Sequence, residues 1–144
     1  MNAFVDTNLL PRFVFDQKKD KENRRYIRLA LRKYTIQHNI VSLVECARNF
    51  RLADHKRKTL HQLLSQDPAV PDHAEWRLAH YLLLDWVQLK RQRDKNAIRK
   101  MQMDCLIAAM AINRQTTIIT SDRDFFDLKN THQGQRLQIF HMSF

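Results

Sequence analysis

The stretch Phe4-Val5-Asp6-Thr7-Asn8-Leu9-Leu10 predicts how the chain begins to fold. Its first two residues form a short apolar run, which indicates a buried strand. The acid, hydroxyl and amide that follow all favour the N-terminus of a helix, here one that begins near Leu9. Asp6 is therefore expected at the carboxyl end of a strand, which is where open α/β sheets bind their ligands.

The length of 144 residues suits a single domain, residues 1–144, which would bury roughly two-thirds of its unfolded surface. No apolar run approaches the ~20 residues that span a bilayer, and Asp6 interrupts the apolar run that a signal peptide would need. We therefore expect a cytoplasmic protein with no membrane partner. Cys46 and Cys105 are isolated, so both are predicted to be small core residues rather than zinc ligands or a disulfide.

The chain is strongly basic, with a formal net charge of +10 and a pI near 10.1. The cations are bunched in three stretches: Lys18, Lys19, Lys21, Arg24, Arg25, Arg28, Arg32 and Lys33; Arg48, Arg51, Lys56, Arg57 and Lys58; Lys90, Arg91, Arg93, Lys95, Arg99 and Lys100. A well-solvated surface is one explanation of this charge. A polyanionic partner, most simply nucleic acid, explains the bunching better.

Only one glycine and three prolines interrupt the chain, which predicts short loops and many helices. Apolar spacing predicts helices over residues 9–15, 21–37, 42–52, 54–65, 72–90 and 98–114, and a helical turn over 121–126. Short apolar runs predict strands over residues 4–5, 39–41, 117–120 and 137–140, with a very short one near Val70. Strands separated by helices predict a Rossmann-like, three-layer α/β/α sandwich with a short, mostly parallel central sheet.

Two acids in the middle of the chain are candidates to join Asp6. Glu45 begins a helix after the second predicted strand, although Ser42 and Glu45 also fit a capping box. Asp104 shares a helix face with apolar residues such as Ile107 and Ala108. A carboxylate on such a face costs free energy unless it is paired. The helix dipole or a nearby arginine is the alternative explanation for Asp104.

The last acidic segment follows the predicted strand at 117–120. Asp122 stands at the carboxyl end of that strand, and Asp124 either replaces it or joins it. A helix cap is the alternative for both, because Ser121 and Asp124 have the spacing of a weak capping box.

Carboxylates that converge at one edge of a sheet repel one another unless a cation lies between them. A set of oxygen ligands favours a hard divalent ion, Mg²⁺ or Mn²⁺, over zinc. Such ions activate water and stabilise the charge that develops on a phosphodiester during attack. A basic surface around an acidic metal site is the combination expected of a nuclease.

The sequence resembles the PIN domain family, in particular the VapC-type toxins of bacterial toxin–antitoxin pairs. Four segments carry the resemblance in the family's order: Phe4-Val5-Asp6-Thr7-Asn8-Leu9-Leu10, Ser42-Leu43-Val44-Glu45, Asp104-Cys105-Leu106-Ile107-Ala108-Ala109-Met110-Ala111 and Ile118-Ile119-Thr120-Ser121-Asp122-Arg123-Asp124-Phe125. They span nearly the whole chain, and the ordered set is far more specific than any one of them. The segment that begins at Glu75 also resembles the family's helical middle.

The resemblance implies a PIN-like fold and a metal-dependent endoribonuclease that leaves 5′-phosphate and 3′-hydroxyl ends. It makes the acidic ligands of Mg²⁺ or Mn²⁺, and so the catalytic residues, Asp6, Glu45, Asp104 and Asp122. Groups that would orient these carboxylates or the attacking water are Thr7, Asn8 and Thr120, with Asp124 beside them. The resemblance further implies an RNA substrate, a cognate antitoxin and a homodimer.

The chain departs from the family pattern in two places. Many relatives carry glycine before and after the helix of the third acid, where this chain has Lys95-Asn96 and Arg114-Gln115. The third strand, near Val70, is hardly visible. The substitutions put the loop shapes in question, and the weak strand puts the completeness of the sheet in question.

Three other functions remain open from the sequence. A basic nucleic-acid-binding protein with a PIN-like fold would use the acids only as caps and ion pairs. A housekeeping PIN nuclease would process RNA without an antitoxin. A phosphatase of the haloacid dehalogenase type is disfavoured, because its chemistry needs an acid two residues after Asp6 and the chain has Asn8 there.

Overall fold

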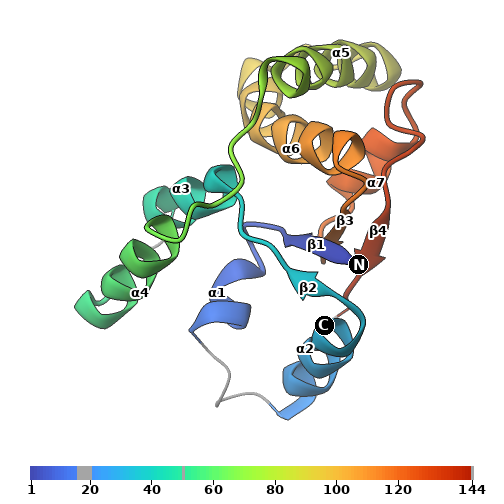
Figure 1. Cartoon of the computed structure of the whole chain (residues 1–144). Helices are drawn as coiled ribbons and strands as arrows, with labels where there is room; N and C mark the ends of the chain where they lie inside the picture. Colours follow the sequence, from blue (N-terminus) through green and yellow to red (C-terminus); the bar gives the residue numbers. More distant parts are fainter. Residues whose placement is uncertain (16–20, 50, 144) are drawn as a thin grey trace.

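A computed structural model describes residues 1–15, 21–49 and 51–143 of the chain (Figure 1). Within these residues, the centre is a four-stranded sheet in the order β2-β1-β3-β4, with every neighbouring pair parallel. The strands are β1 (Asn2–Val5), β2 (Thr35–Ile36), β3 (Thr117–Thr120) and β4 (Ile139–His141). The α/β/α sandwich with a short parallel sheet, predicted from the sequence, is confirmed.

Helices cover both faces of this sheet. They are α1 (Leu10–Val14), α2 (Lys21–Lys33), α3 (Ile40–Asn49), α4 (Asp54–Leu64), α5 (His73–Lys90), α6 (Lys95–Asn113) and α7 (Asp124–Lys129). One apolar core joins α5, α6 and α7 to Phe4 and Ile118, and a second joins α1, α2, α3 and α4 to Val5 and Ile119. Figure 1 shows α5 and α6 on one side of the sheet and α1 and α2 on the other. Consecutive strand residues therefore serve opposite cores, as the two-residue period of a strand requires.

The sheet has a switch point between β1 and β3. The chain leaves β1 to form β2 on one side, and then crosses back to form β3 on the other side of β1. In the register of β1 and β3, Val5 pairs with Ile119, and the Asp6 N–H donates to the Ile119 carbonyl oxygen at 2.9 Å. Asp6 and Thr120 are thus aligned at the carboxyl edge, where such a switch point forms a ligand-binding crevice.

The prediction of a strand over residues 39–41 is wrong, because the second strand of the sheet is Thr35–Ile36. Asn39 is the residue before α3, and its Oδ1 accepts a hydrogen bond from the Ser42 N–H at 2.8 Å. This bond satisfies a backbone donor of the first helical turn, so the apolar residues after Asn39 begin a helix. A single parallel bridge between Asn39 and Ala69 is the structure's counterpart of the very short strand predicted near Val70.

Two predicted helix boundaries also shift. The helix predicted over 21–37 ends at Lys33, because Tyr34 turns into the core and Thr35 begins β2. The helix predicted from residue 98 begins at Lys95, where Asp94 caps it by accepting the Asn96 N–H at 2.9 Å. Phe50, within the predicted helix 42–52, lies outside the described residues, as do Lys18 and Lys19 of the basic stretch.

A buried ion pair joins the start of α5 to the end of α6. Glu75 is fully buried, and Arg114 donates to both of its carboxylate oxygens at 2.8 Å. Asp72 and Glu75 also form a capping box, and Asn113 donates to Glu75 at 3.2 Å. Burial alone would raise the pKa of Glu75, but these hydrogen bonds and the Arg114 charge hold it below its ordinary value.

Gln115 follows Arg114, in one of the two places where the sequence departs from the expected family pattern. Its φ of 52° lies in the left-handed region that glycine favours. The turn between α6 and β3 therefore keeps a conformation suited to glycine without that residue. None of the described helices is long and apolar enough to cross a membrane.

Candidate metal centre

Three carboxylates meet at the carboxyl edge of the sheet. One oxygen each of Asp104, Asp122 and Asp124 lies within 4.8 Å of the other two. Asp104 projects from the middle of α6, and the other two come from the turn between β3 and α7. Oxygens at this spacing can share one cation, and the cluster includes both Asp122 and Asp124.

Asp6 is buried beside this cluster, with 2% of its surface exposed. Its Oδ2 accepts a hydrogen bond from the Thr120 hydroxyl at 2.9 Å. Burial raises the pKa of Asp6 to about 6; the Thr120 hydrogen bond opposes this shift, and the charges of Asp122 and Glu45 add to it. The adjacent parallel strands β1 and β3 therefore bring Asp6 and Asp122 within electrostatic reach of each other.

Glu45 reaches the same edge from the middle of α3. The Thr7 hydroxyl donates to its Oε1 at 3.0 Å. Burial raises the pKa of Glu45, against the Thr7 hydrogen bond and the charge of Arg48. Asn39 rather than Ser42 caps α3, so the capping-box interpretation of Ser42 and Glu45 is wrong.

Asp104 is the acid that the alternatives explain least well. It is half-buried at the tenth position of the 19-residue α6, beyond the first turn where the helix dipole acts. No ion pair among the described residues includes it. Burial raises the pKa of Asp104 to about 9, helped by the charges of Asp6, Glu45, Asp122 and Asp124. An unpaired carboxylate among four others favours a cation in the site.

Asp122 has a local structural role as well. Its Oδ1 accepts the Asp124 N–H at 2.9 Å, and its own N–H donates to the Thr120 hydroxyl oxygen at 2.9 Å. The alternative interpretation of Asp122 as a helix cap is not met, because Arg123 is the N-cap of α7 and α7 has no side-chain cap. Thr120 links Asp6 to the turn before α7 by donating to one and accepting from the other. Burial raises the pKa of Asp124, as do the charges of Asp122 and Asp127.

The remaining residues predicted for the site differ in their contacts with the acids. Thr7 and Thr120 hold two of the acids, whereas Asn8 is exposed, and none of the hydrogen bonds described for the chain joins it to the acids. His141, which the sequence did not single out, ends β4 in register with Thr120. Its Nε2 lies 3.3 Å from the Ser121 carbonyl oxygen. The feature that could have identified His141 from the sequence is its place at the end of a parallel strand.

Five carboxylates from four separate segments thus gather at the switch point of a parallel sheet. A donor set made only of oxygen atoms fits a hard divalent ion such as Mg²⁺ or Mn²⁺. The fold and the acids together define an α/β protein with an acidic centre at the carboxyl edge of its sheet.

The chain belongs to the PIN domain family, whose sequence profile matches residues 3–130. The family resemblance seen in the sequence is therefore confirmed. No curated protein matches the sequence significantly.

The solved structures that share this fold include the following two. One is VapBC2 from Rickettsia felis bound to a DNA fragment from their promoter, with a TM-score of 0.63, 18% identity, and coverage of 99% of this chain and 100% of that chain. The other is FitAcB from Neisseria gonorrhoeae, with a TM-score of 0.62, 16% identity, and coverage of 96% of each chain.

Proposed function

We propose that the protein is a Mg²⁺-dependent endoribonuclease and the toxin of a type II toxin–antitoxin pair. The observation that carries this proposal is the position of Asp104, a half-buried acid with no described cation partner and with four other carboxylates around it. Membership of the PIN domain family supports nuclease activity. A binding protein without chemistry has no need to concentrate this much negative charge in one place.

The five acids would have different roles in binding an ion. Asp104, Asp122 and Asp124 would hold Mg²⁺ or Mn²⁺ most directly, because their oxygens lie within 4.8 Å of one another. Asp6 and Glu45 would complete the site, each fixed in orientation by a threonine hydroxyl. A bound ion would supply an activated water and stabilise the charge that develops on the phosphodiester.

The proposed substrate is RNA, attacked at its phosphodiester bonds in the cytoplasm. The acidic centre by itself would repel a nucleic acid. The net charge of +10 opposes that repulsion and draws a polyanion to the surface. Basic charge around an acidic metal site therefore fits a nuclease better than it fits an enzyme for small neutral substrates.

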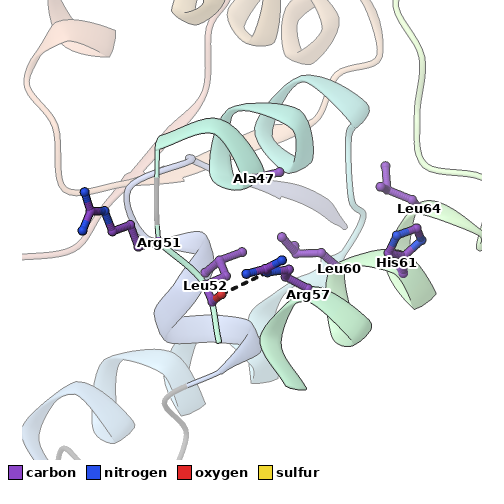
Figure 2. Close-up of a pocket in the computed structure, with 7 residues that line it drawn as sticks. All are labelled: Ala47, Arg51, Leu52, Arg57, Leu60, His61 and Leu64. Atoms are coloured by element: carbon purple, nitrogen blue, oxygen red, sulfur yellow. Dashed lines mark hydrogen bonds between the residues drawn. The ribbon is translucent and has the colours of Figure 1, made fainter. Parts of the chain in front are cut away.

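An antitoxin is proposed as the protein partner, in line with the VapBC2 and FitAcB structures that share the fold. A groove between α3 and α4 suits such a partner (Figure 2). Its apolar lining is Ala47, Leu52, Leu60 and Leu64, and its basic lining is Arg51, Arg57 and His61. A segment with apolar anchors and acidic flanks would complement this groove. The product of an adjacent small reading frame is expected to co-purify with the protein and to inhibit cleavage.

Cleavage of RNA by the purified, antitoxin-free protein tests the enzymatic proposal. We expect cleavage in Mg²⁺ that stops in excess chelator, and a loss of at least 100-fold in Asp104→Asn, about the size of effect seen when an electrostatic catalytic group is removed. Asp54→Asn removes the same charge from exposed α4 and should cleave like the wild type.

Thermal stability separates the proposal from a nucleic-acid-binding protein without chemistry. A real metal site should raise the Tm with increasing Mg²⁺ by mass action. The proposal is wrong if the wild type binds RNA without cleaving it and its Tm does not respond to Mg²⁺.

A further inference from the structure

The helix α2 concentrates positive charge away from the acidic centre. Its 13 residues contain six cations against Glu22 alone, a net charge of +5, which is half of the chain's +10. Arg24, Arg25, Arg28 and Arg32 line one concavity of ≈ 470 Å³, together with Leu29. No described ion pair includes any of these arginines.

Arg24, Arg28 and Arg32 form a regular row along the helix, the α2 arginine row, because of how α2 packs. Ile27, Ala30 and Tyr34 are buried against the sheet, which turns the opposite side of the helix outward. Arg24, Arg28 and Arg32 are spaced by four residues, so they lie about 6 Å apart along one side of the helix. The Nε of Arg24 is shielded from solvent and has no hydrogen-bond partner in the described part of the chain. A buried donor without a partner points to a missing acceptor.

We propose that this α2 arginine row binds the phosphodiester backbone of a single-stranded RNA substrate. The proposal rests on the proposed ribonuclease activity and adds the surface that holds the strand. Guanidinium groups bind phosphate oxygens in a bidentate manner, and a basic track along the backbone is the usual way to hold a single strand without reading its sequence.

The position of α2 in the fold suits this role. It lies beside β2 at the edge of the sheet (Figure 1). Since α2 leads back to the start of a parallel strand, its first turn is directed towards the carboxyl edge of the sheet, where the acids lie. Arg24 is therefore the arginine of the row nearest to that edge. The row would hold a strand whose phosphates the five carboxylates would otherwise repel.

An acidic protein segment fits this surface less well than RNA does. Peptide docking relies on apolar anchors placed in pockets, and Leu29 is the single apolar residue of the concavity. The groove between α3 and α4 has four such residues. The α2 arginine row offers repeated charge instead of anchors, which matches a repeated phosphate.

Binding of a labelled 20-nucleotide poly(U) RNA, in chelator to prevent cleavage, tests the proposal. The triple variant Arg24→Ala/Arg28→Ala/Arg32→Ala should bind at least tenfold more weakly than the wild type. The slope of log K against log salt should fall by roughly 2, since each phosphate contact in a single strand contributes about 0.7. The corresponding triple Arg→Lys variant should keep most of the salt slope and lose part of the affinity.

The matched control is Arg77→Ala/Arg93→Ala/Lys95→Ala, which removes three exposed cations from α5, the turn after it and the start of α6. Circular dichroism verifies that every variant is folded. Equal losses of affinity in the two alanine triples would mean that only net charge matters, and the proposal would be wrong. Unchanged RNA affinity in the α2 triple would also overturn it, and would leave this face to an acidic protein partner.

Cleavage in Mg²⁺ distinguishes the failure of this proposal from the failure of the ribonuclease function. The α2 triple should show a raised KM and an unchanged kcat, because its residues bind the RNA strand at a distance from the phosphate that reacts. If the wild type cleaves RNA and the α2 triple has the same KM, the role of the α2 arginine row is contradicted and the ribonuclease proposal is not. A wild type that does not cleave RNA contradicts the ribonuclease proposal.

Discussion

At the scale of single residues, Asp104 couples the stability of the metal-free protein to pH. Its pKa is about 9 in the folded chain, against 3.8 for an ordinary aspartate. The folded state therefore holds this proton more tightly than the unfolded state does. The stability from this group is fully present below pH 3.8 and is lost as the pH rises towards 9. Without metal, the protein should become less stable from mildly acidic to alkaline pH.

Asp104→Asn should therefore raise the Tm of the metal-free protein while it abolishes cleavage. Replacing a repelled carboxylate by a neutral isostere should gain about 1–2 kcal/mol at pH 8, or a few degrees for a chain of this size. Thermal melts in chelator at pH 5 and pH 8 measure the effect, which should be larger at pH 8. Mg²⁺ should raise the Tm of the wild type more than that of the variant. A variant less stable than Asp54→Asn at pH 8 would contradict this account.

Asp6, Asp104 and Asp122 were predictable from the sequence because each stands next to a strand or on an apolar helix face, whereas the strand expected just before Glu45 does not form. Asp6 and Asp122 follow short apolar runs, and Asp104 interrupts a run of small and apolar residues. The exposure of Asn8 was not predictable, because its neighbour Thr7 has similar chemistry and only the path of the chain into α1 separates them. The link through Thr120 depends on the register of β1 and β3, which no local pattern contains.

At the scale of elements, the second strand shows where local patterns fail. Ile40 and Val41 suit either a strand or the first turn of a helix, and the Asn39 side chain selects the helix by accepting the Ser42 N–H. The true strand, Thr35–Ile36, has two residues, too few to show a two-residue period. Its place is fixed instead by pairing with β1. The six helices predicted from apolar spacing all exist, with shifted ends.

Breaking the ion pair between Glu75 and Arg114 should destabilise the packing of α5 on α6. Arg114→Met would leave the fully buried Glu75 carboxylate without its cation, at a cost of about 3 kcal/mol. Chemical denaturation measures this free energy. The double variant Glu75→Gln/Arg114→Met should recover part of the loss, because no unpaired charge then remains. Since the pKa of Glu75 is lowered in the folded state, the wild type should lose stability as the pH falls through that lowered pKa.

Arg77→Met is the control for this pair, since Arg77 is an exposed cation on the same helix. It should change the free energy of unfolding by less than about 0.5 kcal/mol. Equal effects of Arg114→Met and Arg77→Met would show that the ion pair contributes nothing to stability. A double variant no more stable than Arg114→Met would show that the loss comes from packing rather than from the unpaired carboxylate.

At the scale of the whole molecule, charge is divided unequally among the surfaces. The outer face of α2 is basic, and the carboxyl edge of the sheet is acidic. The helix α5 is neutral, with two cations against two acids, and its exposed side chains include Trp76, Tyr81 and Leu84 at 55%, 51% and 52% exposure. Two chains of charge +10 repel each other, so a second copy would meet the least repulsion at a neutral, apolar face.

We expect the protein to form a homodimer through α5, and we expect Leu84→Arg to convert it to a monomer. The substitution would place like charges against each other across a two-fold axis, where each copy of the residue meets the same surface of its partner. Light scattering after size exclusion should give about twice 17.3 kDa for the wild type and 17.3 kDa for Leu84→Arg. Leu29→Arg makes the same change on α2, where Leu29 is 47% exposed, and should remain a dimer. If Leu29→Arg were a monomer and Leu84→Arg a dimer, the interface would lie at α2 instead of α5. RNA binding along the α2 arginine row would then compete with dimerisation.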